Sequence, residues 1–266
     1  MAIPRLMGVV NVTPDSFSDG GRYLDPAAAI AHGLQLIEDG ATLLDIGGES
    51  TRPGAQPVSQ AQEMARVLPV IEGLAGRGAI LSIDTHKPAV ARAAVKAGAR
   101  MWNDVTALGS DAALAAAASL KCDVVLMHMK GEPRTMQAAP QYEDVVLEVC
   151  DFLITRAEAA IAAGVKRDAI LIDPGVGFGK TLEHNLSLIA HLDRIVALGF
   201  PVVLGVSRKR FIQALDLGAR EPTNRLGGSL AAALAGAAAG AAVLRVHDVR
   251  ETAQALTVQE AVRGAS

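Results

Sequence analysis

Eight short apolar runs along the chain are each followed at once by a polar or charged residue. In chain order, the runs and the residues that end them are 6–10 with Asn11, 42–44 with Asp45, 80–83 with Asp84, 101–102 with Asn103, 124–127 with His128, 170–172 with Asp173, 202–206 with Ser207, and 241–244 with Arg245 and His247. In a parallel β/α barrel, the carboxyl ends of all strands meet at one face, and active sites lie on that face. The pattern therefore predicts both a barrel and the location of its functional site.

Segments with helical spacing separate these runs, and most of them end at a glycine, a common signal at helix C-termini. The expected helices cover residues 26–39, 59–74, 88–97, 112–120, 143–163, 182–198, 225–239 and 249–263. The alternation of strand and helix continues over 266 residues without a change of composition. Because a closed β/α barrel typically needs about 250 residues, we expect an α/β fold with a single (β/α)8 TIM-barrel domain over residues 1–266. Six or seven true strands would instead favour an open sheet.

Two connections are longer than a tight turn from strand to helix. They are residues 11–25 after the first run and 47–58 after the second, and both are rich in Gly, Pro, Ser, Thr and Asp. Long connections without secondary structure in a compact domain are often functional. We expect both loops to act as lids over the barrel mouth.

Composition excludes several classes of partner. A net charge of -3 provides no basic field for nucleic acid. The most apolar stretch, 230–244, is dominated by alanine and interrupted by glycine, so no membrane span is expected. Polar residues begin too early, at Asn11, for a signal peptide, and Cys122 and Cys150 form no CxxC motif. We therefore expect a cytoplasmic protein with reduced thiols that binds neither nucleic acid nor membrane.

Basic residues follow the last two runs. Ser207, Arg208 and Lys209 follow the seventh, and Arg245 and His247 follow the eighth. The loops after strands seven and eight of β/α barrels frequently bind phosphate. Arginine offers phosphate oxygens a two-pronged set of donors, and lysine offers a compact charge. We therefore expect a phosphate or diphosphate site; the alternative is a set of surface charges.

Asp84, Asn103 and Asp173 end the third, fourth and sixth runs. A carboxylate accepts two parallel N–H bonds, and an amide both donates and accepts. Together they suit an amino-substituted heterocycle such as a pterin or a guanine-like ring. A metal site is a weaker alternative, because hard cations usually take more oxygen ligands, and any one of the three could instead brace a loop.

Asp45 and His128 are weaker candidates. Asp45 stands just before Gly47 and Gly48, and we expect it to orient that loop. His128 has no HxH or HExxH companion, so hydrogen-bonded support is a better interpretation than metal binding.

The segment 173–181, DPGVGFGKT, only superficially resembles a phosphate-binding loop. The P-loop requires glycine where Pro174 stands, and the dinucleotide fingerprint requires one where Lys180 stands. We expect its glycines to let the backbone approach a flat ligand, with Phe178 available for stacking.

Several segments resemble those of the dihydropteroate synthase family, the pterin-binding folate enzymes that sulfonamides inhibit. In chain order they read GVVNVTPDSFSDGG (8–21), GATLLDIGGESTRPG (40–54), SIDTHKP (82–88), WNDVTA (102–107), MHMKGEPRTMQ (127–137), DPGVGFGKT (173–181), GVSRKRF (205–211) and RVHDV (245–249). The resemblance covers essentially the whole chain. It implies a β/α barrel, typically a homodimer, that condenses (7,8-dihydropterin-6-yl)methyl diphosphate with 4-aminobenzoate. The products of this alkyl transfer are 7,8-dihydropteroate and diphosphate, and the implied cofactor is Mg²⁺.

The resemblance also assigns roles to individual positions. It implies that Asn11 coordinates Mg²⁺ together with the substrate diphosphate. The residues implied to hold the pterin ring are Asp84, Asn103, Met127, Asp173, Phe178, Gly205 and Lys209. Those implied to hold the diphosphate are Arg52, Arg245 and His247, and those near 4-aminobenzoate or in its loops are Phe17, Thr51, Pro53 and Ser207. The predicted catalytic residues are Asn11, Asp84, Lys209, Arg245 and His247.

Three positions depart from the family pattern, although none of them is a proposed site residue. Thr42 stands where an acidic residue is common, Lys130 where glutamine is usual, and Arg210 where a small residue is typical. Two other functions are alternatives. A pterin-dependent methyltransferase domain shares the barrel and the ring-binding carboxylates but gives no reason for the basic residues after the last two runs. A non-catalytic paralogue would bind pterin without turnover.

Overall fold

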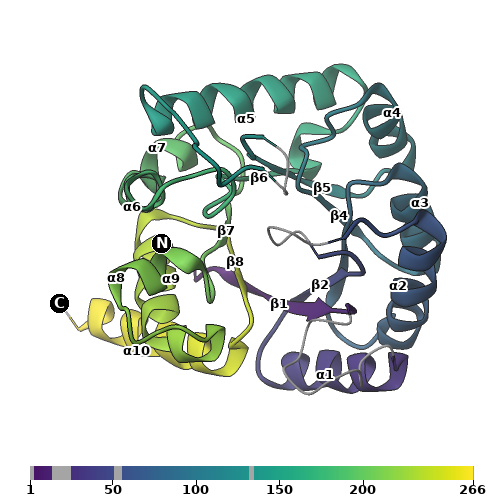
Figure 1. Ribbon diagram of the computed structural model, residues 1–266. Helices are drawn as coiled ribbons and strands as arrows, with labels where there is room; N and C mark the ends of the chain where they lie inside the picture. Colours follow the sequence, from purple (N-terminus) through teal and green to yellow (C-terminus); the bar gives the residue numbers. More distant parts are fainter. Residues whose placement is uncertain (1–2, 14–24, 51–55, 132–134, 266) are drawn as a thin grey trace.

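Eight parallel strands form one sheet that curves into a barrel (Figure 1), in the order β6-β5-β4-β3-β2-β1-β8-β7. The computed structural model describes residues 3–13, 25–50, 56–131 and 135–265. The strands are β1 (Arg5–Asn11), β2 (Leu43–Gly47), β3 (Ile80–Asp84), β4 (Met101–Asp104), β5 (Asp123–Met127), β6 (Ile170–Asp173), β7 (Val203–Gly205) and β8 (Val243–Val246). The ends of the sheet meet where Ile172 of β6 bridges Val202, just before β7. The predicted TIM barrel is confirmed.

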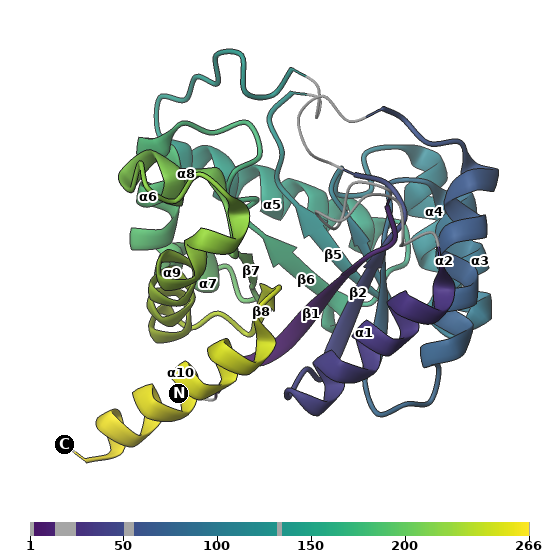
Figure 2. The ribbon, with the colours of Figure 1, turned by 60° about the horizontal axis from the view of Figure 1, so that its bottom comes forward.

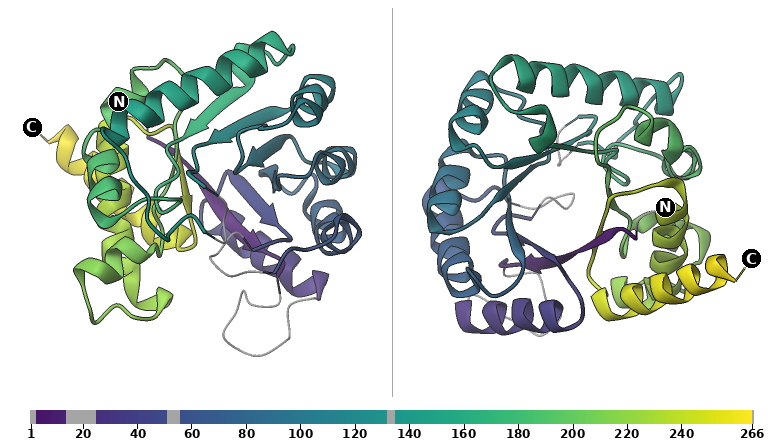
Figure 3. Two further views of the ribbon diagram at one scale, coloured as in Figure 1. Left: turned by 45° about the horizontal axis from the view of Figure 1, so that its top comes forward. Right: turned by 180° about the vertical axis from the view of Figure 1, so that it is seen from behind.

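Helices surround the barrel on its outside, which the right-hand view of Figure 3 shows from behind. They are α1 (Pro26–Glu38), α2 (Gln60–Leu74), α3 (Pro88–Ala97), α4 (Asp111–Leu120), α5 (Val145–Ala162), α6 (Leu182–Ala190), α7 (Leu192–Val196), α8 (Arg210–Leu215), α9 (Leu226–Ala239) and α10 (Val249–Gly264), with short 3-10 turns η1 (Arg167–Ala169) and η2 (Pro222–Arg225). At five of the described helix starts, a side-chain oxygen of the capping residue accepts a hydrogen bond from a free backbone N–H group of the first turn. The capping residues are Asp25, Ser59, Ser110, Asp144 and Thr181. Figure 2 shows α10 projecting from the barrel near the start of β1. Among the described helices, none is long and apolar enough to cross a membrane.

The structure differs from the expected elements in three ways. The single helix expected over 182–198 is two, because the backbone leaves the helical conformation at His191, with φ -114° and ψ 31°. The short helix α8 was not expected at all. The second strand continues through Asp45, which therefore lies within β2 instead of ending it. None of these positions carries a proline or a glycine that would have marked the change.

Two apolar layers hold the barrel together, because alternate side chains of a strand point to opposite faces. The inner layer fills the barrel with Met7, Leu43, Met101, Val125, Leu171, Val203 and Val243. The outer layer lies between strands and helices and consists mostly of Ala, Val, Leu and Ile. The helices approach closely: a Cβ added to Gly236 of α9 would lie 2.1 Å from Cδ2 of Leu204 in β7.

The register of the parallel strands brings the polar strand ends side by side. Asn11 of β1 pairs with Gly47 of β2, and Gly47 pairs with Asp84 of β3. Asp84 in turn pairs with Asn103 of β4. On the other side of the barrel the partners are Met127 with Asp173 and Gly205 with Arg245. Residues far apart in the sequence therefore meet at one rim.

Candidate active site

A cavity opens at this rim, and it encloses about 350 Å³ including the part open to solvent. Its lining residues are Asp84, Asn103, Val105, Met127, Asp173, Gly175, Val176, Phe178, Gly205, Lys209 and Arg245. All the residues that the family resemblance assigned to the pterin ring are among them.

A hydrogen-bonded group of four side chains connects β2, β3, β4 and β8. Arg245 donates from Nε to Asp45 Oδ2 at 2.6 Å and from Nη2 to Asp84 Oδ2 at 2.9 Å. Asn103 donates from Nδ2 to the same Asp45 oxygen at 2.9 Å. Asp45 is fully buried, and within the described part of the chain its Oδ1 has no hydrogen-bond partner. Asp45 therefore fixes both Arg245 and Asn103, a role that its position inside an apolar run did not reveal.

The ionisable groups of the cavity have shifted pKa values. Burial, and then the charge of Asp45, raise the pKa of Asp84 to about 7, although Arg245 opposes the shift. Burial likewise raises the pKa of Asp173. Burial lowers the pKa of Lys209 to about 8, although Asp173 opposes that shift. Burial acts against the charge of Arg245 too, but Asp45 and Asp84 outweigh it and raise its pKa. Near neutral pH the Asp84 carboxylate can therefore exchange a proton beside the fixed positive charge of Arg245.

Flat and flexible apolar groups form the walls between these charges. The ammonium of Lys209 lies 4.2 Å from the centre of the Phe178 ring, a cation–π contact. Met127 is buried at the end of β5. At Gly205 a Cβ would lie 4.0 Å from both Asp173 Oδ2 and Arg245 Cβ, so the glycine leaves the space between them open.

The glycines of the loop after β6 have a structural purpose besides the expected approach to a ligand, and Gly175 also lines the cavity. Gly175 has φ +65°, and a Cβ there would lie 1.9 Å from the carbonyl oxygen of His128. Gly179 has φ +63°, and its Cβ would lie 2.2 Å from the carbonyl oxygen of Lys130. The glycines therefore let this loop pack against the backbone that follows β5.

Lys180 organises the same loop from inside. Its Nζ donates to the carbonyl oxygens of Gly175 at 3.0 Å and Phe178 at 2.9 Å, and it lies 2.9 Å from Nδ1 of His128. Burial, together with the charge of Lys180, lowers the pKa of His128 to about 3, so the ring is neutral and can accept this bond. The expected supporting role of His128 is confirmed.

The polar residues that follow β7 and β8 make two separate contacts, Ser207 with His247 and Arg208 with Asp248. The backbone N–H of His247 donates to Ser207 Oγ at 3.2 Å, and the ring Nδ1 of His247 lies 3.0 Å from the same oxygen. Arg208 instead directs its guanidinium to Asp248 and bonds both carboxylate oxygens. Arg208 is thus paired within the protein and does not line the cavity.

Asn11 ends β1 close to Asp84. A Cβ added to Gly47, which lies between them in the sheet, would be 3.8 Å from Asn11 Oδ1 and 3.6 Å from Asp84 Oδ2. Mg²⁺ often takes one or two protein oxygens and completes its shell with water and substrate phosphate. The described residues contain no group of three or more His, Cys, Asp or Glu that could hold a metal ion. Asn11 Oδ1 is thus the kind of single protein oxygen that suits an ion arriving with a phosphorylated substrate.

Four predicted residues, Phe17, Thr51, Arg52 and Pro53, lie outside the described residues. Of the positions that depart from the family pattern, Lys130 pairs with Glu148 at 3.2 Å and lies 4.0 Å from the centre of the Tyr142 ring. Arg210 is exposed at the start of α8.

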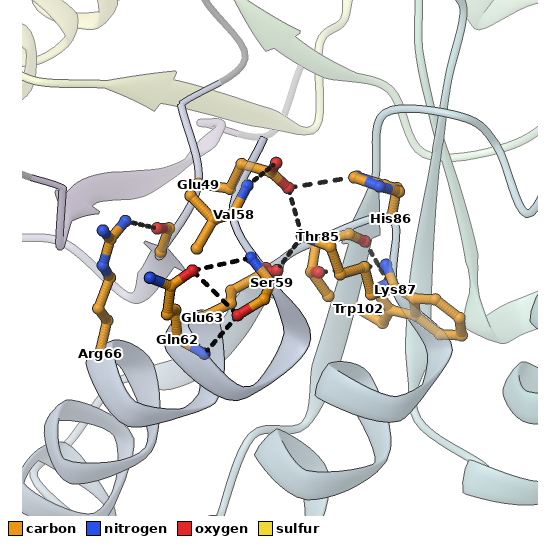
Figure 4. A network of polar contacts seen from close by, with 11 residues as sticks. Glu49, Val58, Ser59, Gln62, Glu63, Arg66, Thr85, His86, Lys87 and Trp102 are labelled. Carbon is orange, nitrogen blue, oxygen red and sulfur yellow. Dashed lines mark hydrogen bonds and ion pairs between the residues drawn. The ribbon is translucent and has the colours of Figure 1, made fainter. Parts of the chain in front are cut away.

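The base of the second long loop is tied to β3 by an ion-pair network (Figure 4). Lys87 Nζ lies 2.6 Å from Glu49 Oε2 and 2.5 Å from Glu63 Oε2. Glu49 also accepts from the backbone N–H of Val58 at 2.9 Å, which joins the two ends of the loop. Lys87 follows Asp84 by three residues, so the network fixes the loop base next to the cavity.

Fold and cavity together define a class of β/α-barrel protein whose site suits a flat, hydrogen-bonding ring beside an anion. A family model described as pterin binding enzyme matches residues 7–247. The chain belongs to this pterin-binding enzyme family.

Similar proteins and solved structures support the same assignment. The dihydropteroate synthase of Escherichia coli (strain K12) is 47% identical over 264 residues, which cover 98% of this chain and 93% of that protein. The solved structure of Xanthomonas albilineans dihydropteroate synthase with 4-aminobenzoic acid is 55% identical, with a TM-score of 0.92, and covers 98% of this chain and 93% of its own. The structure of the Xanthomonas albilineans enzyme in complex with 7,8-dihydropteroate is 53% identical, with a TM-score of 0.89, and covers 98% and 94%.

Proposed function

We propose that this chain is a dihydropteroate synthase. It condenses (7,8-dihydropterin-6-yl)methyl diphosphate with 4-aminobenzoate and releases 7,8-dihydropteroate and diphosphate. The observation that carries the proposal is one cavity that Asp84, Asn103 and Asp173 line together with Lys209 and Arg245. Its similarity along nearly the whole chain to enzymes of this name supports the same activity.

The ring is held by complementary hydrogen bonds. The carboxylates of Asp84 and Asp173 accept from ring and amino N–H groups, while the amide of Asn103 both donates and accepts. Lys209 donates to a ring acceptor, and Phe178 and Met127 cover the ring faces. A ring without the paired N–H groups would leave these buried acceptors without partners, which makes the site selective.

The difficult step is the breaking of the bond between the pterin methylene carbon and the diphosphate oxygen. Negative charge develops on the departing diphosphate, and the groups that we place near it are His247 and the positively charged Arg245. Mg²⁺, held by Asn11 and the diphosphate, supplies further positive charge there when bound. The amine of 4-aminobenzoate is largely neutral and nucleophilic, so no strong base is required.

We infer a dissociative substitution, in which the bond to diphosphate breaks before the amine attacks. The carboxylates of Asp84 and Asp173 favour positive charge on the ring and so stabilise a short-lived pterin cation. A chemical step whose single-turnover rate depends on the amine concentration to first order, without saturation, would contradict this order of events.

The first test is diphosphate release by the purified protein given dihydropterin diphosphate, Mg²⁺ and 4-aminobenzoate, with each omitted in turn. Release that requires all three, with dihydropteroate as the product, establishes the synthase. Pterin binding without release would favour the non-catalytic paralogue. Methyl transfer without any dependence on diphosphate would favour the methyltransferase.

Three further properties follow from the family resemblance and belong to the proposal. We expect a cytoplasmic homodimer that is inhibited by sulfonamides in competition with 4-aminobenzoate. Sedimentation analysis of the purified protein at several concentrations tests the dimer, and inhibition measured at increasing 4-aminobenzoate tests the competition.

A further inference from the structure

Arg208 has an unusual backbone conformation for its residue type. Its φ is +58°, in the left-handed region that favours glycine. Neighbouring side chains hold both of its peptide groups: its N–H donates to Ser229 Oγ at 2.8 Å, and its carbonyl oxygen accepts from Arg225 Nη1 at 3.0 Å. A conformation of this kind costs free energy and persists only where the surroundings fix it.

The side chain of Arg208 provides a third attachment. Its guanidinium bonds both oxygens of Asp248, with Nε 3.0 Å from Oδ2. The side chains of Arg208 and Asp248 are only 29% and 16% exposed, so solvent screens the pair weakly. Because Asp248 directly follows His247, the pair joins the loop after β7 to the loop after β8.

The two neighbours of Arg208 are both residues that the family resemblance assigns to the site. Ser207 contacts His247 through its hydroxyl oxygen at 3.0 Å from Nδ1, and Lys209 lines the cavity with its ammonium beside the Phe178 ring. Arg208 itself does not line the cavity. The left-handed turn at residue 208 thus directs one side chain to Asp248, while Lys209 lines the cavity and Ser207 contacts His247.

We propose that Arg208 is a positioning residue: its pair with Asp248 holds the left-handed backbone that places Lys209 against the ring site and Ser207 against His247. The inference deepens the proposed function, on which it rests for the identity of the ligand. In this proposal Arg208 does not bind the diphosphate itself, because its guanidinium is bonded to Asp248.

The test compares Arg208→Ala with Arg208→Gly. Both variants lose the ion pair, but only glycine adopts a positive φ without strain. We expect Arg208→Ala to bind 6-hydroxymethylpterin about tenfold more weakly, whereas Arg208→Gly stays within about threefold of the wild type. Asp248→Asn, which keeps the shape and removes the charge, is expected to weaken binding in the same direction. Calorimetric titration measures these constants, and the exposed Arg250→Ala serves as the control with unchanged binding.

Two results would overturn the inference. If Arg208→Ala lowers the urea midpoint but leaves pterin binding and the KM for dihydropterin diphosphate within twofold, the role of Arg208 is limited to stability. If Arg208→Gly binds as weakly as Arg208→Ala, backbone conformation is not what the pair controls. Pterin binding requires no turnover, so a wild-type protein that binds pterin but releases no diphosphate refutes the proposed function and still allows this comparison.

Discussion

Replacing Lys87 by methionine is expected to destabilise the protein strongly, because it leaves a buried carboxylate without its countercharge. Glu63 is fully buried, and Lys87 Nζ lies 2.5 Å from its Oε2. Removing one partner of a buried ion pair costs about 3–5 kcal/mol. For a chain of this size, about 2–4 °C are lost per kcal/mol, so the melting temperature should fall by roughly 6–20 °C.

A paired variant tests the cause of this loss. Lys87→Met combined with Glu63→Met removes both charges and fills a similar volume, and such replacements of buried ion pairs are often close to neutral. Most of the lost stability should therefore return. Lys96→Met, at an exposed position of the same helix α3, is the matched control.

The assay is urea denaturation at pH 7 followed by circular dichroism, with variants compared only where their m-values agree. A loss below about 1 kcal/mol for Lys87→Met, which is the range of exposed pairs, would refute the reasoning. So would a double variant that is as unstable as Lys87→Met alone, since the cost would then not arise from the charge of Glu63.

Three shorter predictions concern the cavity and its support. With pKa values of about 7 for Asp84 and about 8 for Lys209, kcat/KM for dihydropterin diphosphate should fall below pH 7, where Asp84 becomes protonated, and above pH 8, where Lys209 loses its proton. Lys209→Met should remove the alkaline limb, and a profile without limbs would contradict these assignments. Gly175→Ala should lower the free energy of unfolding in urea by about 3 kcal/mol or more, because its Cβ would lie 1.9 Å from the His128 carbonyl oxygen. The control Gly264→Ala should change this free energy little, because nothing lies within 4 Å of its Cβ. Chelation with EDTA should abolish diphosphate release until Mg²⁺ is restored. Asn11→Ala should raise the Mg²⁺ concentration that gives half the maximal rate about tenfold, without changing the binding of 6-hydroxymethylpterin. An unchanged Mg²⁺ dependence would exclude Asn11 as a ligand.

The strand ends were predictable from the sequence because an apolar run that stops at a polar residue has a direct physical meaning. The run must be buried, and its polar end must find water, a partner or a ligand. This rule located Asp84 and Asp173 at the ends of their strands and Asn103 one residue before the end of β4, and the structure brings all three to one cavity.

Other features depend on three-dimensional contacts that no local pattern reports. Asp45 lies within an apolar run, and its function depends on Arg245, which is 200 positions away. The sequence around Arg208 does not distinguish it from an arginine that binds an anion. Its guanidinium points to Asp248, a contact that only the structure reveals. The helix break at His191 likewise is not marked by a proline or a glycine in the sequence. Sequence reasoning therefore identified the chemistry of the site better than its internal connections.

The inner apolar layer of the barrel has a kinetic consequence. Met7, Leu43 and Met101, with their neighbours in that layer, close the barrel beneath the cavity in the part of the chain that the structure describes. A ring seated between Asp84 and Asp173 must then enter and leave through the mouth, past any molecule bound nearer to solvent. If the amine binds nearer to the mouth than the ring does, the ring has to load first. The joined product has to withdraw whole, so its departure frees both positions at once.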